Sequence, residues 1–353
     1  MEIINGNQSK KMKKIVIIFI TTLLLTSCYE DYVKDYYYSA AYVAYQYDLR
    51  TFVIGETDKF DISVALAGVI KNDKDRQVNV VIDDSLVMED ISGIIPGSSY
   101  FTAFEGMMGK APFGDLSQGY VTDAIRDAGV SSMSVLPKDY YTVEGIKSMK
   151  FVKGSHNAFA TIKATDKIKT DPNAFIPYYA IGYRITSADV DTVITSKSFG
   201  VVAVRCENKF YGNWYHGGKT LLIDDASSEV ISEDVYPFAI PQSDERCYEL
   251  RTVNANTVIT DKVGTKAGKL HLVFDGSTIK ISSADGSLPI LNMNDAESTH
   301  NEAKLLQDRE IYLNYKYSNG DGTSTIVSDT LYFRNRIRDG INEWQDENPK
   351  NYN

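Results

Sequence analysis

Apolar and polar side chains alternate along much of the chain, beginning near Ala40. In the clearest run, 60–67, four large apolar residues from Phe60 to Leu66 occupy every second position. This period of two predicts a strand with one buried face. Further strand-like runs lie at 78–83, 140–143, 147–151, 158–164, 176–186 and 198–205. Gly, Asn, Asp and Pro separate these runs, which predicts a β-sandwich of short strands.

A second set of alternating runs follows in the last third of the chain, at 270–274, 279–281 and 311–317. The motif Asn-Gly-Asp-Gly at 319–322 predicts a tight hairpin turn, because Asn and Gly tolerate positive φ. The predicted fold is therefore all-β. An immunoglobulin-like β-sandwich at 40–206 precedes an antiparallel β-barrel or β-sandwich of lipocalin-like type at 207–345, and 346–353 forms a tail.

Residues 84–139 interrupt the first domain as a long insertion with few strand signals. From Val121 to Ala128 the apolar positions have helical spacing, and Gly129 supplies a stop, which predicts a helix. The rest of the insertion is apolar for a loop and includes Tyr100 and Phe101. Two interpretations follow: the insertion packs onto the sandwich, or it forms a surface for a ligand or partner.

The N-terminus carries the most specific signal in the sequence. Four lysines between Lys10 and Lys14 precede an apolar run at 15–25, which is too short to cross a bilayer because a transmembrane helix needs about 20 apolar residues. The run ends in Leu-Thr-Ser-Cys, which resembles the lipobox of bacterial lipoproteins. We therefore expect 1–27 to be a signal peptide and Cys28 to carry the lipid that anchors the protein to the outer membrane.

Charge and start site refine this prediction. The chain has a net charge of −10, and removal of the leader makes the mature protein about −13, so nucleic acid is not an expected partner. Met12 stands directly before two lysines and the apolar run, so it is an alternative start to Met1. We expect the tyrosine-rich segment 28–39 to be a tether. Its Glu30-Asp31 pair is similar to the signal that sends Bacteroidetes lipoproteins to the cell exterior.

Two cysteines, Cys206 and Cys247, remain in the mature chain beside Cys28. In an oxidising envelope they could pair and close a loop of about 40 residues, which would stabilise the fold by roughly 3 to 4 kcal/mol. Two free thiols are the equal alternative, because the sequence does not show whether their Cα atoms approach within about 7 Å.

Several segments together resemble a family of Bacteroidetes surface lipoproteins of uncharacterised function. They are the lipobox with its acidic followers, FDISVALAGV at 60–69, VVID at 80–83, LPKDYY at 136–141 and DTLYFRNRIRDG at 329–340. The resemblance implies an immunoglobulin-like N-terminal domain and a separate C-terminal β domain. It also implies a genetic setting of polysaccharide utilisation, with outer-membrane glycan import proteins as partners. The insertion departs from the usual family pattern.

Motifs of known catalytic chemistry are missing from the sequence. The four histidines, His156, His216, His271 and His300, have no metal-binding spacing, and there is no nucleophile elbow, phosphate loop or dinucleotide fingerprint. The pairs at 224–225 and 321–322 could offer oxygens to calcium but are typical of turns. The sequence therefore predicts a non-catalytic protein without a metal or cofactor.

Aromatic side chains are the remaining chemical signal, with 24 tyrosines and 14 phenylalanines. A tyrosine offers an apolar face and a hydroxyl to a sugar, although strands also use aromatics for packing. Candidate ligand-binding residues are Tyr100, Phe101, Tyr211, Trp214 and Tyr215.

Trp214 has a second interpretation. The Gly-x-Trp pattern at 212–214 is similar to that of lipocalins, in which a late arginine covers a buried tryptophan; Arg334, Arg336 or Arg338 could take that part here. The sequence thus predicts a cell-surface, non-catalytic lipoprotein that binds glycan for polysaccharide capture and import. The alternative is a structural or adhesive subunit that binds another envelope protein.

Overall fold

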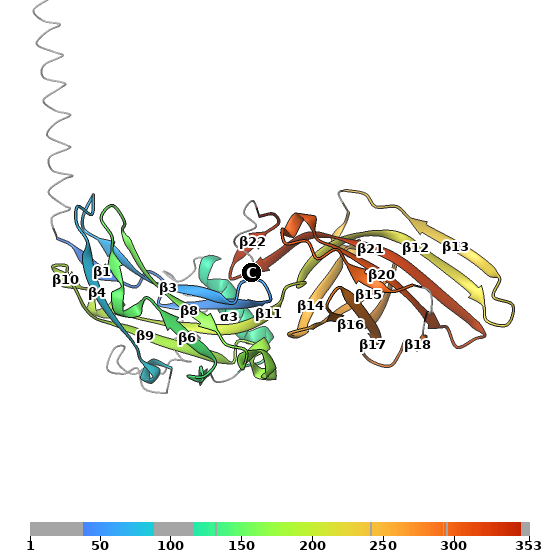
Figure 1. Ribbon diagram of the computed structural model, residues 1–353, viewed down its shortest axis with the longest axis horizontal. Helices are drawn as coiled ribbons and strands as arrows, with labels where there is room; N and C mark the ends of the chain where they lie inside the picture. The colour runs from blue at the N-terminus through green and yellow to red at the C-terminus, as the bar shows by residue number, and fades with distance from the viewer. Residues whose placement is uncertain are drawn as a thin grey trace, which may run out of the picture.

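The computed structural model describes residues 38–87, 116–130, 133–240, 242–291, 293 and 296–346. The protein has two β modules, a sandwich and a barrel, which lie end to end along the long axis of the molecule (Figure 1). The described residues contain a single α-helix, so the predicted all-β class is confirmed. This helix is too short and too polar to cross a bilayer.

The sandwich consists of two sheets. The first has the strand order β10 (Thr192–Val193), β1 (Ala40–Tyr42), β3 (Lys59–Ala67), β8 (Asn157–Ala164) and β6 (Tyr141–Glu144). The second has the order β2 (Tyr47–Ile54), β11 (Phe199–Asn208), β9 (Tyr179–Ala188), β4 (Arg76–Ile82) and β7 (Lys150–Phe151), with β5 (Ser134–Val135) beside β9. The first described strand, β1, belongs to the first sheet, and the chain crosses at β2 to the second, where β2 runs parallel to β11.

The predicted strands agree with this arrangement except at one place. A strand was expected over 147–151, but only β7 is extended there, and Ile146–Ser148 forms a 3-10 turn. The turn follows Gly145, whose φ of 78° lies in the left-handed region and ends the preceding strand. Other 3-10 turns are Asp84–Leu86, Ile168–Thr170, Pro172–Phe175, Thr195–Lys197, Asp244–Arg246 and Leu306–Asp308.

The helix predicted from the spacing at 121–128 is present as α3 (Leu116–Asp127), and it covers the outer face of the second sheet. Val121 and Ile125 pack there against apolar residues of β2 and β11. Because the sheet is buried on both faces there, residues 179–183 of β9 and 199–204 of β11 are continuously apolar instead of alternating. The described part of the insertion therefore packs onto the sandwich. Tyr100 and Phe101 lie outside the described residues.

The barrel follows directly from β11. Its eight strands pair in a closed ring: β12 (Gly212–Asp224), β14 (Tyr248–Asn254), β15 (Thr257–Val263), β16 (Lys266–Asp275), β17 (Thr278–Ser283), β19 (Ser298–His300), β20 (Glu310–Ser318) and β21 (Thr323–Arg338). Pairing of β12 with β21 closes the ring. Three strands add to its margins: β13 (Val230–Tyr236) beside β12, β18 (Ile290–Leu291) beside β20 and β22 (Ile341–Glu343) beside β21.

The barrel interior holds an apolar cluster that includes Trp214, together with a buried pair of polar side chains, His216 and Asp329. Trp214 packs edge-on against Phe333, and its indole N–H donates to the Phe210 carbonyl at 3.2 Å. The His216 Nδ1 lies 3.0 Å from the Asp329 carboxylate, and both side chains are buried. Burial raises the pKa of Asp329, although His216 opposes this shift. These contacts fill the interior with side chains.

Candidate functional site

A buried ionic cluster joins the two modules. Glu56 lies in the turn between β2 and β3 of the sandwich. Its carboxylate forms ion pairs with the guanidinium groups of Arg336 and Arg309 from the barrel, and Arg336 also donates hydrogen bonds to it. All three side chains are almost fully buried. Burial alone would raise the pKa of Glu56, but the two arginines hold it below its usual value. The turn is therefore fixed in the end of the barrel by charge-assisted hydrogen bonds.

The hairpin between β21 and β22 extends this contact to the sandwich. Asp339 and Gly340 form its tight turn with φ values of 50° and 77°, the combination that Asp-Gly favours in hairpins. The Asp339 carboxylate accepts hydrogen bonds from the Thr51 amide at 3.0 Å and the Thr51 hydroxyl at 2.7 Å. Gly340 lies so close to the Tyr120 ring of α3 that a Cβ there would come within 2.6 Å of it. The hairpin thus holds both β2 and the helix.

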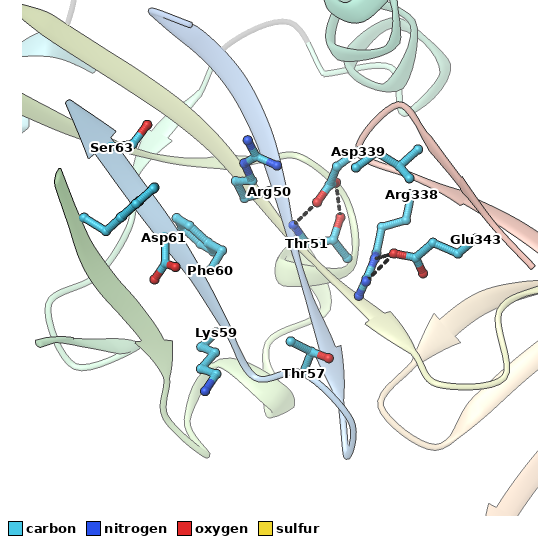
Figure 2. Close-up of a pocket in the computed structure, with 12 residues that line it drawn as sticks. Arg50, Thr51, Thr57, Lys59, Phe60, Asp61, Ser63, Arg338, Asp339 and Glu343 are labelled. Atoms are coloured by element: carbon cyan, nitrogen blue, oxygen red, sulfur yellow. Dashed lines mark hydrogen bonds and ion pairs between the residues drawn. The ribbon is translucent and has the colours of Figure 1, made fainter. Parts of the chain in front are cut away.

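A groove of about 350 Å³ lies at this junction (Figure 2). Strands β2, β3 and β8 of the sandwich form one wall, and the hairpin forms the other. Its lining residues are Arg50, Thr51, Thr57, Lys59, Phe60, Asp61, Ser63, Phe159, Arg338, Asp339, Ile341 and Glu343. Figure 2 shows the hydrogen bonds between Thr51 and Asp339, which join the two walls, and the pairing of Arg338 with Glu343 within the hairpin.

The charges of the groove are balanced in number, and two of its three cations form ion pairs. Three lining residues are cationic and three are acidic. Arg338 pairs with Glu343 across the hairpin, and Arg50 pairs with Asp48 at 2.7 Å. Burial raises the pKa of Asp339, against the lowering effect of its hydrogen bond with Thr51. Because the lining has equal numbers of cationic and acidic residues, the groove offers charged donors and acceptors with little net charge.

Two apolar side chains stand exposed beside these polar groups. Phe159 of β8 is 54% exposed and Ile341 of β22 is 59% exposed, although both line the groove. Phe159 points outward because its register on β8 alternates with the buried Ala158 and Ala160. An aromatic surface with charged hydrogen-bonding groups around it can hold the C–H face and the hydroxyls of a sugar.

Of the aromatic residues expected to bind ligand, the three that the structure describes, Tyr211, Trp214 and Tyr215, do not line this groove. Trp214 is 0% exposed, so its candidacy as a binding residue is corrected: it is part of the barrel core, where no ligand can touch it. Tyr211 is half-buried near Glu207, and burial raises its pKa. Tyr215 lies on the outer barrel wall, with the Arg334 guanidinium 5.5 Å from its ring centre.

The three arginines expected to cover Trp214 have separate positions. Arg336 is the one that packs at the Gly-x-Trp end of the barrel. A Cβ added to Gly212 would lie only 2.9 Å from the Cβ of Arg336. Arg334 covers Tyr215 instead, and Arg338 lines the groove. Sequence reasoning missed Phe159, Thr51 and the hairpin; the Asp-Gly pair at 339–340 was the signal that could have located the hairpin.

The other candidate positions have structural roles or lie outside the described residues. Cys206 and Cys247 are buried free thiols, so the disulfide is not formed; Cys206 belongs to the sandwich core, while Cys247 lies beside Arg334 on the barrel. Asp224 and Asp321 cap their own turns by accepting backbone N–H groups, as expected of turn residues. In the parts of 38–346 that the structure describes, no three potential metal ligands converge. Cys28 lies outside this range.

Comparison with known proteins places the fold among structures from Bacteroides. No family model matches the chain, and no curated protein is significantly similar to it. A crystal structure of a protein of unknown function from Bacteroides ovatus matches with a TM-score of 0.56 at 16% identity, covering 88% of this chain and 98% of that one. This likeness shows that the two chains share a fold across both modules.

Two more distant structures are also similar to the chain. One is a multidomain protein including DUF1735 from Bacteroides ovatus, with a TM-score of 0.37 and 10% identity over 87% of this chain and 100% of that one. The other is an auxiliary nutrient binding protein from Bacteroides thetaiotaomicron, with a TM-score of 0.35 and 13% identity over 82% and 89%. Such TM-scores are too low to support a conclusion about this protein.

Proposed function

We propose that this protein is a lipid-anchored, non-catalytic protein of the outer cell surface that binds a neutral stretch of glycan in the groove between its modules. The observation that carries the proposal is the groove itself. It sets the exposed Phe159 and Ile341 among three cationic and three acidic residues, of which Arg338 and Glu343 pair with each other. Sugar rings stack on apolar surfaces, and their hydroxyls bind well to ionised planar groups.

The ionic cluster supports this proposal because it preorganises the groove. One wall comes from the sandwich and the other from the barrel, so any relative movement of the modules would change the width of the groove. Glu56 and Arg336 restrain such movement with buried, charge-assisted bonds. A preformed site loses less entropy on binding than a mobile one.

The leader and Cys28 support the location, and Figure 1 is compatible with it. Strand β1, the first strand of the described chain, lies at the end of the sandwich away from the barrel (Figure 1). An anchor at Cys28 would therefore hold the sandwich near the membrane and leave the barrel farther out. A glycan at the cell surface could then reach the groove from outside.

Affinity electrophoresis in gels that contain single polysaccharides tests this proposal with the purified full-length protein in mild detergent. We expect at least one neutral polysaccharide to retard the protein, and Phe159→Ala to abolish the retardation. Tyr45→Ala is the matched control, since Tyr45 is an aromatic of similar exposure, 53%, outside the groove. Lack of retardation by every polysaccharide, or equal loss in both variants, would refute the groove as the site.

Tryptophan fluorescence provides a second readout. The chain has two tryptophans: Trp214 is buried, whereas Trp344 is 57% exposed and follows Glu343 of the groove. A bound oligosaccharide should change the emission of Trp344, and Trp344→Phe should remove that change. A change that persists in Trp344→Phe would place the ligand elsewhere.

A further inference from the structure

The barrel wall has a gap between β17 and β20. Strand β19, which stands between them, pairs with β17 only at Thr278 and Ile279. Among the described residues, no strand pairs with β17 on this side beyond Ile279, and β18 joins β20 only at Lys316 and Tyr317. The two short strands therefore leave the middle of β20 without a neighbouring strand on this side.

A side chain takes the place of the missing strand at the middle of β20. The Ser298 hydroxyl accepts a hydrogen bond from the Asn314 amide N–H at 2.8 Å and donates one to the Asn314 carbonyl at 2.9 Å. The Asn314 side-chain amide in turn donates to the Glu297 carbonyl at 3.2 Å. These bonds satisfy the backbone of Asn314 without closing the gap, and they hold the backbone of Glu297 beside it.

A pocket of about 460 Å³ occupies the gap and reaches the barrel core. Ile279 and Tyr315 belong to the core, and Ile281 and Ile290 pack against it, yet all four line the pocket. Leu291, which is 37% exposed, forms part of the apolar wall. A concave site of this size, with apolar walls and a few polar groups, is typical of sites for small molecules.

The charges around this pocket favour a cation. Lys280 and Glu297 are the charged residues that line it. The Lys280 ammonium is 3.1 Å from the Asp275 carboxylate, whereas Glu297 is exposed and forms no ion pair with any described residue. Along the chain, four acidic residues and no lysine or arginine stand between Lys280 and Lys304. A positive ligand is therefore attracted to this side of the barrel, and a negative one is repelled.

We propose that this pocket binds a small organic ammonium ion with an apolar body. The apolar body contacts Ile281, Ile290 and Leu291, and the ammonium group faces the Glu297 carboxylate. Burial of the apolar body supplies most of the affinity, since a single exposed ion pair contributes little. Glu297 instead discriminates between ligands of different charge. The inference does not rest on glycan binding in the groove, because no residue lines both sites.

Three probes of similar shape test the proposal: phenethylammonium, phenethyl alcohol and hydrocinnamate. Saturation-transfer NMR measures their binding to the full mature chain with Cys28→Ser, which keeps both modules and needs no detergent. We expect phenethylammonium to bind with a Kd of about 1 mM, and the alcohol to bind about threefold more weakly. The anionic hydrocinnamate should bind weakest. Equal binding of phenethylammonium and hydrocinnamate, or no binding of any probe, would overturn the proposal.

Two substitutions assign the contacts. Glu297→Gln should weaken phenethylammonium binding about threefold and leave phenethyl alcohol unchanged, because it removes only the charge. Glu245→Gln is the matched control and should change neither, since Glu245 is an exposed carboxylate of the barrel outside the pocket. Leu291→Gln should weaken both probes, because it removes part of the apolar wall. Phenethylammonium binding that neither Glu297→Gln nor Leu291→Gln affects would rule out this pocket.

Methionine methyl signals locate the ligand independently of affinity. Met293 lines the pocket, whereas Met149 is buried in the core of the sandwich. In protein with methyl-labelled methionine, phenethylammonium should shift the Met293 signal, which Met293→Leu identifies by its loss. The Met149 signal should stay in place. A shift confined to methionines of the sandwich would contradict the proposed site, whether or not the groove binds glycan.

Discussion

Replacement of Arg336 with methionine tests whether the ionic cluster at the junction stabilises the protein. The Arg336 side chain is 1% exposed and binds Glu56 on the sandwich and Glu343 on the hairpin. Methionine keeps much of the volume but leaves Glu56 buried with one arginine instead of two. Loss of one partner from a buried ion pair costs about 3 to 5 kcal/mol.

The expected cost lies at the lower end of this range, near 3 kcal/mol, because Arg309 still contacts Glu56 at 2.9 Å. Urea unfolding followed by far-UV circular dichroism and by the fluorescence of the buried Trp214 measures the free energy of unfolding. Two probes are needed because a two-module chain can unfold in more than one step.

Arg251→Met is the matched control for this substitution. Arg251 also binds two carboxylates, Glu249 at 2.9 Å and Asp261 at 2.6 Å, but its side chain is 40% exposed. Water and salt screen such a pair, so its loss should cost less than about 1 kcal/mol. If Arg336→Met lowered the free energy of unfolding no more than Arg251→Met, burial would not explain how the junction cluster stabilises the protein.

The pH dependence of the same variant has a definite sign. The pKa of Glu56 is depressed in the folded protein from its ordinary value of 4.5. Its contribution to stability is therefore complete above about pH 4.5 and is lost as the pH falls through the folded value. The difference in unfolding free energy between the native protein and Arg336→Met should therefore become smaller as the pH falls below about 4.5. A difference that stays constant down to pH 3 would contradict this assignment.

Three further predictions concern single side chains. Burial raises the pKa of Glu207 and outweighs the lowering effect of Arg205, its ion-pair partner at 2.8 Å, so Glu207→Gln should change the free energy of unfolding at pH 7 by less than about 1 kcal/mol or increase it; a large loss in urea unfolding would contradict this. Gly340→Ala should lower the thermal midpoint more than Gly320→Ala, because both have positive φ but only the former meets an aromatic ring. The native thiols should resist Ellman's reagent until the protein unfolds, because Cys206 and Cys247 are buried and burial raises the pKa of Cys206 to about 12; rapid labelling of the folded protein would exclude this arrangement.

Several features of the fold were predictable because their cause is local. Alternation at 60–67 predicts β3, since the side chains of a strand point to opposite faces in turn. The spacing from Val121 to Ala128 predicts α3, and Asn-Gly-Asp-Gly at 319–322 predicts the turn between β20 and β21. In each case, neighbours along the chain are also the residues in contact, so the sequence pattern carries the signal.

The candidate site was not predictable, because its residues are far apart in the sequence. Asp339 binds Thr51 across 288 positions, and Arg336 reaches Glu56 across 280. The alternation on β8 shows that Phe159 points away from the core, but not which module lies beside it. Only the docking of the barrel on the sandwich turns these outward-facing residues into a groove. Sequence periodicity determines the buried face of each strand, whereas packing between modules decides which exposed residues meet.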